Sequence, residues 1–227
     1  MSGFREVLNR LVNGIRHFYR LYVLRDAFSW NMKRWFMDKG DETLRLDYPI
    51  DKSGIVFDVG GYIGDYANDI NQRYGCRVYL FEPVPSFYQE SVRRFSGNPS
   101  IVCLNFGLSS HSGWFDMSLD DNASSFRIVG HPCATQKAQV RAISEVVAEL
   151  GVERIDLMKI NIEGAEFDLL PAIIDSGLIK QINYIQIQFH NFVDGAVENR
   201  QLIRAALGRT HREMWNYDFV WESWELR

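Results

Sequence analysis

Cysteine and long apolar runs are scarce in this chain of 227 residues. Its three cysteines, Cys76, Cys103 and Cys133, are an odd number without the spacing of a metal site, so we predict no metal centre. Cys76 and Cys103 lie in or beside apolar stretches, where reduced thiols are the simplest interpretation, and this favours a cytoplasmic location. No apolar run reaches the roughly 18 residues of a membrane span, and the N-terminus lacks the apolar core of a signal peptide. We therefore expect neither.

An excess of positive charge is also missing. The chain has 25 lysine and arginine residues against 29 aspartate and glutamate residues, and its net charge is −4. This balance gives no support for a nucleic-acid partner. Hydrophobic residues make up 46% of the chain, which is enough for one substantial core. We predict a catalytic domain over residues 51–227, preceded by a helical extension or cap at residues 1–50.

The segment from Ile55 to Tyr66 predicts a buried strand, a tight turn and the start of a helix. Small residues stand where the backbone has to approach a ligand, and these are Gly60, Gly61 and Gly64. A second predicted strand, residues 77–81, ends at Glu82, eighteen residues beyond Gly64. An acidic residue at this place holds ribose hydroxyls in Rossmann-like sites. The two features together predict a site for a nucleoside-bearing cofactor.

The turn also indicates which cofactor fits. The glycine spacing breaks the G-x-G-x-x-G pattern of dinucleotide sites, which disfavours the alternative of an NAD-dependent oxidoreductase. Asp58, directly before the turn, would repel a pyrophosphate but would attract an amino group or a sulfonium. The segment resembles the first motif of S-adenosylmethionine-dependent methyltransferases, so we predict that Asp58 holds the amino-acid end of this cofactor and that Glu82 binds its ribose. Asn105, which ends a third predicted strand, completes the predicted cofactor site.

A second informative cluster runs from Ile155 to Glu166 and predicts a strand, a turn and a helix. Asn161 and Glu163 follow the strand, and polar residues at a strand's carboxyl end face the crevice where open α/β sheets bind ligands. Both are candidates for orienting the substrate or the cofactor. The alternative is structural, with Glu163 favouring the positive end of the following helix and Asn161 completing the turn.

His190 is the candidate proton acceptor. It follows a fifth predicted strand, residues 182–189, and an imidazole with an ordinary pKa of about 6.5 is suited to accept a hydroxyl proton near neutral pH. A purely structural histidine is the competing interpretation.

The chain resembles the FkbM family of methyltransferases from about residue 55 to residue 195. The resemblance is carried by Asp58-Val59-Gly60 with Gly64, by Phe81-Glu82-Pro83 and by Lys159-Ile160-Asn161-Ile162-Glu163-Gly164-Ala165-Glu166. It implies an O-methyltransferase that uses S-adenosylmethionine and acts on a hydroxyl of a sugar, a glycan or a related natural product. Two positions depart from the family, which usually has aspartate in place of Asn161 and asparagine in place of Tyr62.

The resemblance also implies the fold. We expect an α/β, Rossmann-like class I methyltransferase with a mostly parallel seven-stranded sheet, helices on both faces and a C-terminal antiparallel hairpin. The aromatic tail, residues 211–227, fits that hairpin. Between residues 107 and 142 the helical spacing is lost, and we predict a hairpin insertion there.

The N-terminal forty residues have an apolar stripe at helical spacing, with basic residues largely off it. One interpretation is a basic amphipathic helix that makes peripheral contact with an anionic membrane or a partner, and the favoured one is a helix that caps the domain. This basic helix and Asn161 also leave open the alternative that the chain is a non-catalytic cofactor-binding or scaffold subunit. The oligomeric state and the acceptor's identity are open.

Overall fold

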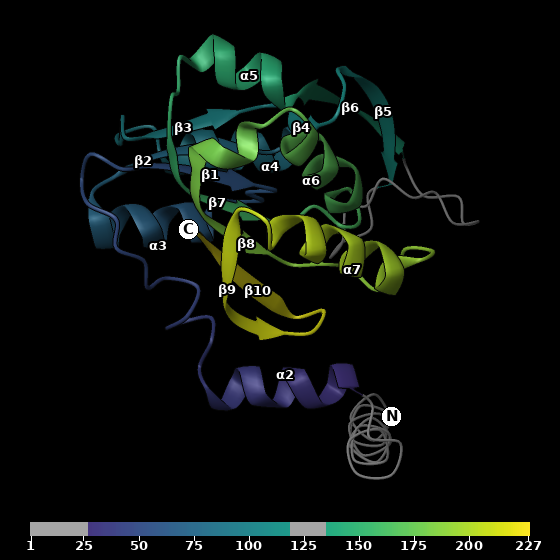
Figure 1. Cartoon of the computed structure of the whole chain (residues 1–227). Coiled ribbons are helices and arrows are strands. Elements are labelled where there is room, and N and C mark those ends of the chain that lie inside the picture. Colours follow the sequence, from purple (N-terminus) through teal and green to yellow (C-terminus); the bar gives the residue numbers. More distant parts are fainter. Residues whose placement is uncertain (1–26, 119–134) are drawn as a thin grey trace, which may run out of the picture. The chain divides into compact units, whose positions relative to one another are not determined.

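The structure is a computed structural model that describes residues 27–118 and 135–227 (Figure 1). The apolar stripe predicted for the N-terminal segment lies mainly outside the described residues. The chain divides into two compact units, one formed by residues 1–47 with 217–220 and the other by residues 48–216 with 221–227. In the described parts of the chain, no helix has the length and apolarity that a membrane crossing needs.

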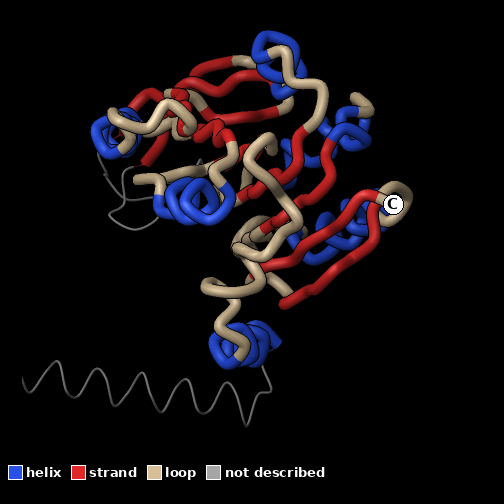
Figure 2. The backbone as a smooth tube through the Cα atoms, turned by 90° about the vertical axis from the view of Figure 1, so that its left-hand side faces the viewer, coloured by secondary structure: helices blue, strands red, loops and turns tan. Residues whose placement is uncertain are grey.

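A seven-stranded sheet organises the larger unit, with the strand order β3-β2-β1-β7-β8-β10-β9. Its strands are β1 (Ile55–Val59), β2 (Arg77–Phe81), β3 (Ile101–Leu104), β7 (Ile155–Ile160), β8 (Ile182–Ile187), β9 (His211–Tyr217) and β10 (Trp221–Leu226). The first five pair in parallel, and β10 pairs antiparallel with β8 to add the C-terminal hairpin. The strands run side by side in the second view (Figure 2). The predicted sheet and hairpin are confirmed.

Helices cover both faces of this sheet. They are α3 (Asp65–Tyr74), α4 (Pro85–Arg94), α5 (Ile143–Leu150), α6 (Glu166–Asp175) and α7 (Ala196–Leu207), with a short 3-10 helix, η2 (Leu178–Gln181). From β1, helices α3 and α4 connect to β2 and β3 on one side of the sheet order, whereas α6 connects β7 to β8 on the other side. Because parallel crossovers are right-handed, these two sets lie on opposite faces. Every residue of β7 is buried, as expected for a strand covered on both sides.

The predicted insertion is a small second sheet. Its strands are β4 (Gly107–Ser109), β5 (Gly113–Ser118) and β6 (Thr135–Ala142), in the order β4-β6-β5. β5 and β6 form the antiparallel pair of the predicted hairpin. β4 pairs parallel with β6 and was not predicted, because three residues are too few to show a strand period.

The smaller unit contains helix α2 (Ala27–Met37). The buried ring of Trp35 packs edge-on against Tyr217, with the ring centroids 5.1 Å apart. Trp35 Nε1 donates a hydrogen bond to Asp41 Oδ2, and the Tyr217 hydroxyl donates one to Asp38 Oδ2. Tyr217, an aromatic residue of the C-terminal tail, therefore serves in packing, and its hydroxyl and the Trp35 indole N–H each meet an acceptor.

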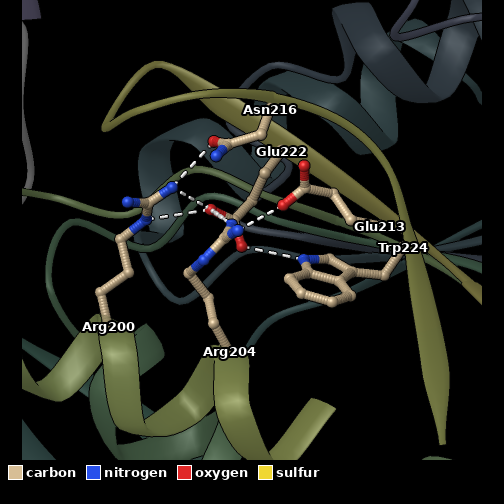
Figure 3. Close-up of polar contacts among 6 residues, drawn as sticks. All are labelled: Arg200, Arg204, Glu213, Asn216, Glu222 and Trp224. Carbon is tan, nitrogen blue, oxygen red and sulfur yellow. Dashed lines mark hydrogen bonds and ion pairs between the residues drawn. The ribbon is translucent and has the colours of Figure 1, made fainter. Parts of the chain in front are cut away.

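A buried charge cluster ties the hairpin to α7 (Figure 3). Glu222 on β10 is 1% exposed, and its Oε2 accepts hydrogen bonds at 2.9 Å from both Arg200 Nε and Arg204 Nη1. Oε2 also accepts from Arg200 Nη2, and Oε1 accepts from Trp224 Nε1. Arg200 also donates to Asn216 on β9. The Glu222 carboxylate thus joins two turns of α7 to β10, and Arg200 extends the cluster to β9.

Removing the Glu222 carboxylate should destabilise the larger unit strongly. Glu222→Ala leaves two guanidinium groups without their main partner, one of them buried, and we expect a loss of about 3–5 kcal/mol in the free energy of unfolding. Arg212→Ala breaks the exposed pair with Glu225 and should cost less than about 1 kcal/mol. Urea unfolding of both variants measures the difference. Equal losses would contradict a special role for the buried cluster.

Candidate active site

The carboxyl ends of β1, β2 and β7 meet where the strand order reverses. β1 lies between the other two strands, with Val59 opposite Phe81 on one side and Ile160 on the other. Open α/β sheets bind their ligands in the crevice at such a point. The turn after β1, the residues after β2 and the turn after β7 therefore form the candidate active site, and most of the predicted cofactor residues lie in them.

The turn after β1 is built around glycines. The peptide N–H groups of Gly60 and Gly61 both donate to the carbonyl of Phe81. Gly60 has a φ of +78°, and a Cβ there would lie 1.9 Å from the carbonyl oxygen of Asn161. A larger residue would push the β1 turn away from the β7 turn. The glycine that sequence reasoning assigned to cofactor approach is thus also required for the contact between the two turns.

Tyr62, the first departure from the family, has a left-handed backbone with a φ of +51°. Asparagine adopts this conformation more easily than tyrosine does, which gives a physical reason for the usual family residue. The ring of Tyr62 is about half exposed and packs edge-on against Phe87 at a centroid distance of 4.4 Å. Its peptide N–H donates to Glu82 Oε2 at 2.8 Å. The backbone of Tyr62 therefore orients the predicted ribose-binding acid.

Glu82 is buried at the end of β2, and its two oxygens are held by main-chain donors. Oε1 accepts from the peptide N–H of Val84 at 2.9 Å, and Oε2 accepts from Tyr62. Burial raises the pKa of Glu82 to about 7, although these two hydrogen bonds act in the opposite direction. Each carboxylate oxygen keeps further lone-pair capacity for a ribose hydroxyl. Asn105 donates through Nδ2 to the carbonyl of Glu82 at 2.9 Å, so it supports the backbone of the acid.

Asp58 forms a buried ion pair that the sequence reasoning did not anticipate. Its side chain is fully buried, and Oδ1 accepts a hydrogen bond from Lys159 Nζ at 2.9 Å. The same ammonium donates to the carbonyl of Gly60 at 2.8 Å. Lys159 was quoted above only as part of a motif, and the signal that could have identified it was a lysine within an otherwise buried strand.

Two buried acceptor atoms near these turns have no hydrogen-bond partner among the described residues. They are Asp58 Oδ2 and Asn161 Oδ1. A buried acceptor without a donor costs free energy, so such atoms indicate the place of a donor that a ligand supplies. The α-ammonium group of S-adenosylmethionine is a donor of this kind. The residues present therefore fit the cofactor that the resemblance implied.

Glu163, Glu166 and His190 come together beside the β7 turn. Glu166 is fully buried, and its Oε1 accepts from both the peptide N–H and the Nδ1 of His190, at 2.8 and 3.0 Å. His190 Nε2 lies 3.4 Å from Glu163 Oε2. Glu163 itself has a φ of +50°, an uncommon backbone for a residue other than glycine. Sequence reasoning named His190 and Glu163 but missed Glu166.

Two carboxylates around one imidazole determine its charge. Burial lowers the pKa of His190, but the hydrogen bonds and charges of Glu163 and Glu166 outweigh this effect and raise the pKa to about 9. The ring therefore holds a proton at neutral pH. Its predicted role as proton acceptor requires a pH above this value and stays a prediction. Within the described residues, no group of three or more His, Cys, Asp or Glu side chains is arranged to hold a metal ion.

The raised pKa of His190 should make stability depend on pH in a defined window. A folded-state pKa of about 9 against an ordinary value of 6.5 contributes about 3 kcal/mol, fully present below pH 6.5 and lost as the pH rises through 9. His190→Asn should remove this part of the pH dependence, whereas His111→Asn at an exposed histidine should retain it. Urea unfolding across this pH range tests the prediction, and identical profiles for all three proteins would refute it.

Comparisons with known proteins agree with this geometry. The profile described as "Methyltransferase FkbM domain" matches residues 58–220. The chain is 36% identical over 96 residues to the AMB antimetabolite synthetase AmbE of Pseudomonas aeruginosa, covering 42% of this chain and 4% of that protein. It is 24% identical over 154 residues to the methyltransferase sdnD of Sordaria araneosa, covering 52% of this chain and 60% of that protein. The chain thus spans less than two thirds of either curated relative.

A solved structure shares the fold. A Streptococcus mutans protein solved in complex with SAH superposes with a TM-score of 0.51 at 9% identity, over 83% of this chain and 97% of that one. The order of the large sheet, the terminal hairpin and the family match lead to one conclusion. The chain belongs to the FkbM family of methyltransferases, with the Rossmann-like class I fold and S-adenosylmethionine as its cofactor.

Proposed function

We propose that this chain transfers the methyl group of S-adenosylmethionine to a hydroxyl of a sugar, a glycan or a related natural product. The observation that carries the proposal is the cluster of Glu163, Glu166 and His190 at the carboxyl ends of β7 and β8. A hydroxyl acceptor has to lose its proton when its oxygen receives the methyl group. Carboxylates and an imidazole beside the cofactor's strand ends are suited to that task.

The contacts described above support an assignment of residues to the cofactor end of the site. In this proposal Glu82 accepts hydrogen bonds from the ribose, while Asp58 Oδ2 and Asn161 Oδ1 accept them from the ammonium of the amino-acid end. When bound, S-adenosylmethionine supplies an activated methyl group on a good leaving group. The protein's task is then to align an acceptor oxygen with that methyl group and to exclude water. Asn161, an amide, orients the cofactor and does not act as a base.

Proton transfer is assigned to the pair of Glu163 and His190. Near neutral pH the ring of His190 is cationic and is held in place by Glu166, so Glu163 is the group able to take the acceptor's proton. His190 then steadies the Glu163 carboxylate from 3.4 Å. Above the pKa of about 9, the ring of His190 can accept the proton itself. The side chain of Glu163 is 27% exposed, which leaves it within reach of a substrate.

Methyl transfer tests the proposal directly. With labelled S-adenosylmethionine and a panel of sugars, nucleotide sugars and glycolipids, we expect methylation of at least one hydroxyl acceptor. Glu163→Gln keeps the size of the side chain but lowers its basicity, so turnover should fall by about a hundredfold or more. The dissociation constant for S-adenosylhomocysteine should stay nearly unchanged in that variant. Tight binding of S-adenosylhomocysteine without transfer to any acceptor would support the cofactor-binding subunit instead.

We also propose that the smaller unit contacts an anionic membrane surface. Helix α2 exposes the side chains of Trp30, Phe36 and Met37, and the last two are 66% and 72% exposed. Lys33 Nζ lies 5.1 Å from the centroid of the Trp30 ring. Residues 1–37 contain seven lysine and arginine residues but two acidic ones, in a chain whose net charge is −4. Aromatic and basic side chains together are typical of segments that lie at the surface of an anionic bilayer.

Vesicle binding distinguishes this contact from a nucleic-acid partner. We expect the protein to sediment with phosphatidylcholine vesicles that contain phosphatidylglycerol and to remain unbound with pure phosphatidylcholine. Replacing Trp30, Phe36 and Met37 by serine should weaken binding about tenfold or more, because the apolar contacts are lost. Leu202→Ser, at an exposed position of α7, is the matched control and should bind normally. Binding to an RNA oligonucleotide in place of the vesicles would reject the membrane proposal.

A further inference from the structure

Lys159 lies at the centre of the cofactor end of the site, although the proposed reaction gives it no role. It is on β7, and its side chain is 4% exposed. Its ammonium contacts the Asp58 carboxylate at the end of β1 and the Gly60 carbonyl in the β1 turn. It also lies 5.7 Å from the ring centroid of Tyr66 on α3. One cation therefore connects β7 with the strand, the turn and the helix of the first motif.

The Asp58 carboxylate is fully buried, and a buried charge needs a partner of opposite sign because burial penalises the charged form. The Lys159 ammonium supplies the compensating charge through Oδ1 of Asp58. The other oxygen, Oδ2, stays buried without a donor. The ion pair thus orients the acid so that one oxygen is satisfied within the protein and the other is left for a ligand.

We propose that Lys159 is a positioning residue for S-adenosylmethionine: it holds the Asp58 carboxylate and the Gly60 carbonyl in the geometry that binds the cofactor's amino-acid end. The inference rests on the proposed cofactor contacts. Lys159 does not itself touch the cofactor in this proposal. It acts through Asp58 and through the position of the Gly60 peptide, which also packs against Asn161.

The same ammonium acts on Glu82. Two charged groups influence this acid, Lys159 from β7, which lowers its pKa, and Asp58 from β1, which raises it. Loss of Lys159 alone should raise the pKa of Glu82, because the charge of Asp58 remains. Loss of both charges should return the pKa of Glu82 toward its wild-type value. The pH at which Glu82 ionises is therefore a readout of the Lys159 charge that a purely structural lysine would not change.

The experiment measures the affinity for S-adenosylhomocysteine between pH 5.5 and 9 by calorimetry. In the wild type, affinity should rise with pH around the Glu82 pKa of about 7, because the ionised acid accepts the ribose hydroxyls better. In Lys159→Met, affinity at pH 8 should fall at least tenfold, and the midpoint of the pH profile should move upward by about one unit. Lys180→Met replaces an exposed lysine and should match the wild type.

A double variant covers the case in which Lys159→Met does not fold. Lys159→Met with Asp58→Asn removes both charges of the pair, which is often tolerated in protein interiors. We expect it to fold, to bind S-adenosylhomocysteine at least tenfold more weakly than the wild type, and to return the midpoint toward the wild-type value. Wild-type affinity in the double variant would overturn the positioning role. Absence of binding in the wild type itself would refute the cofactor contacts of the proposed function, and the inference with them.

Discussion

A buried ion pair joins the two strands between which the order of the large sheet reverses. Asp58 on β1 and Lys159 on β7 are register partners in the sheet, and their side chains meet at its carboxyl edge. Buried pairs of this kind seldom add much stability, since desolvation offsets most of their attraction. What the pair provides here is geometry, because it determines where the β1 turn lies relative to the β7 turn. The remaining polar contacts of the site are arranged around these two turns.

The charges of the site form two groups with different consequences. At the end of β2, burial raises the pKa of Glu82 to about 7, and the two peptide N–H groups that hold it and the nearby Lys159 offset this only in part. Beside the β7 turn, the hydrogen bonds and charges of Glu163 and Glu166 outweigh burial and keep the imidazole of His190 cationic at neutral pH. Burial therefore decides the charge of the acid, whereas two neighbouring carboxylates decide the charge of the imidazole.

The sequence predicted the fold well because its signals are local. The strand expected at residues 77–81 has the bounds observed for β2, and the polar residues expected at strand ends lie there. The pairing of Lys159 with Asp58 could not be predicted, since it depends on the register of two strands whose residues are 101 positions apart. The charge of His190 was equally inaccessible. It requires two glutamates from the β7 turn to contact a ring that lies 24 residues beyond Glu166 in the chain.

The contact between Tyr62 and Glu82 has an evolutionary consequence. Glu82 uses only the peptide N–H of residue 62, so the acid places no demand on the side chain at that position. Exchange of asparagine for tyrosine there costs about 1 kcal/mol of backbone strain and keeps the peptide contact that orients Glu82. The side chain at position 62 can therefore change, and with it the half-exposed surface beside Phe87, while the orientation of Glu82 is conserved.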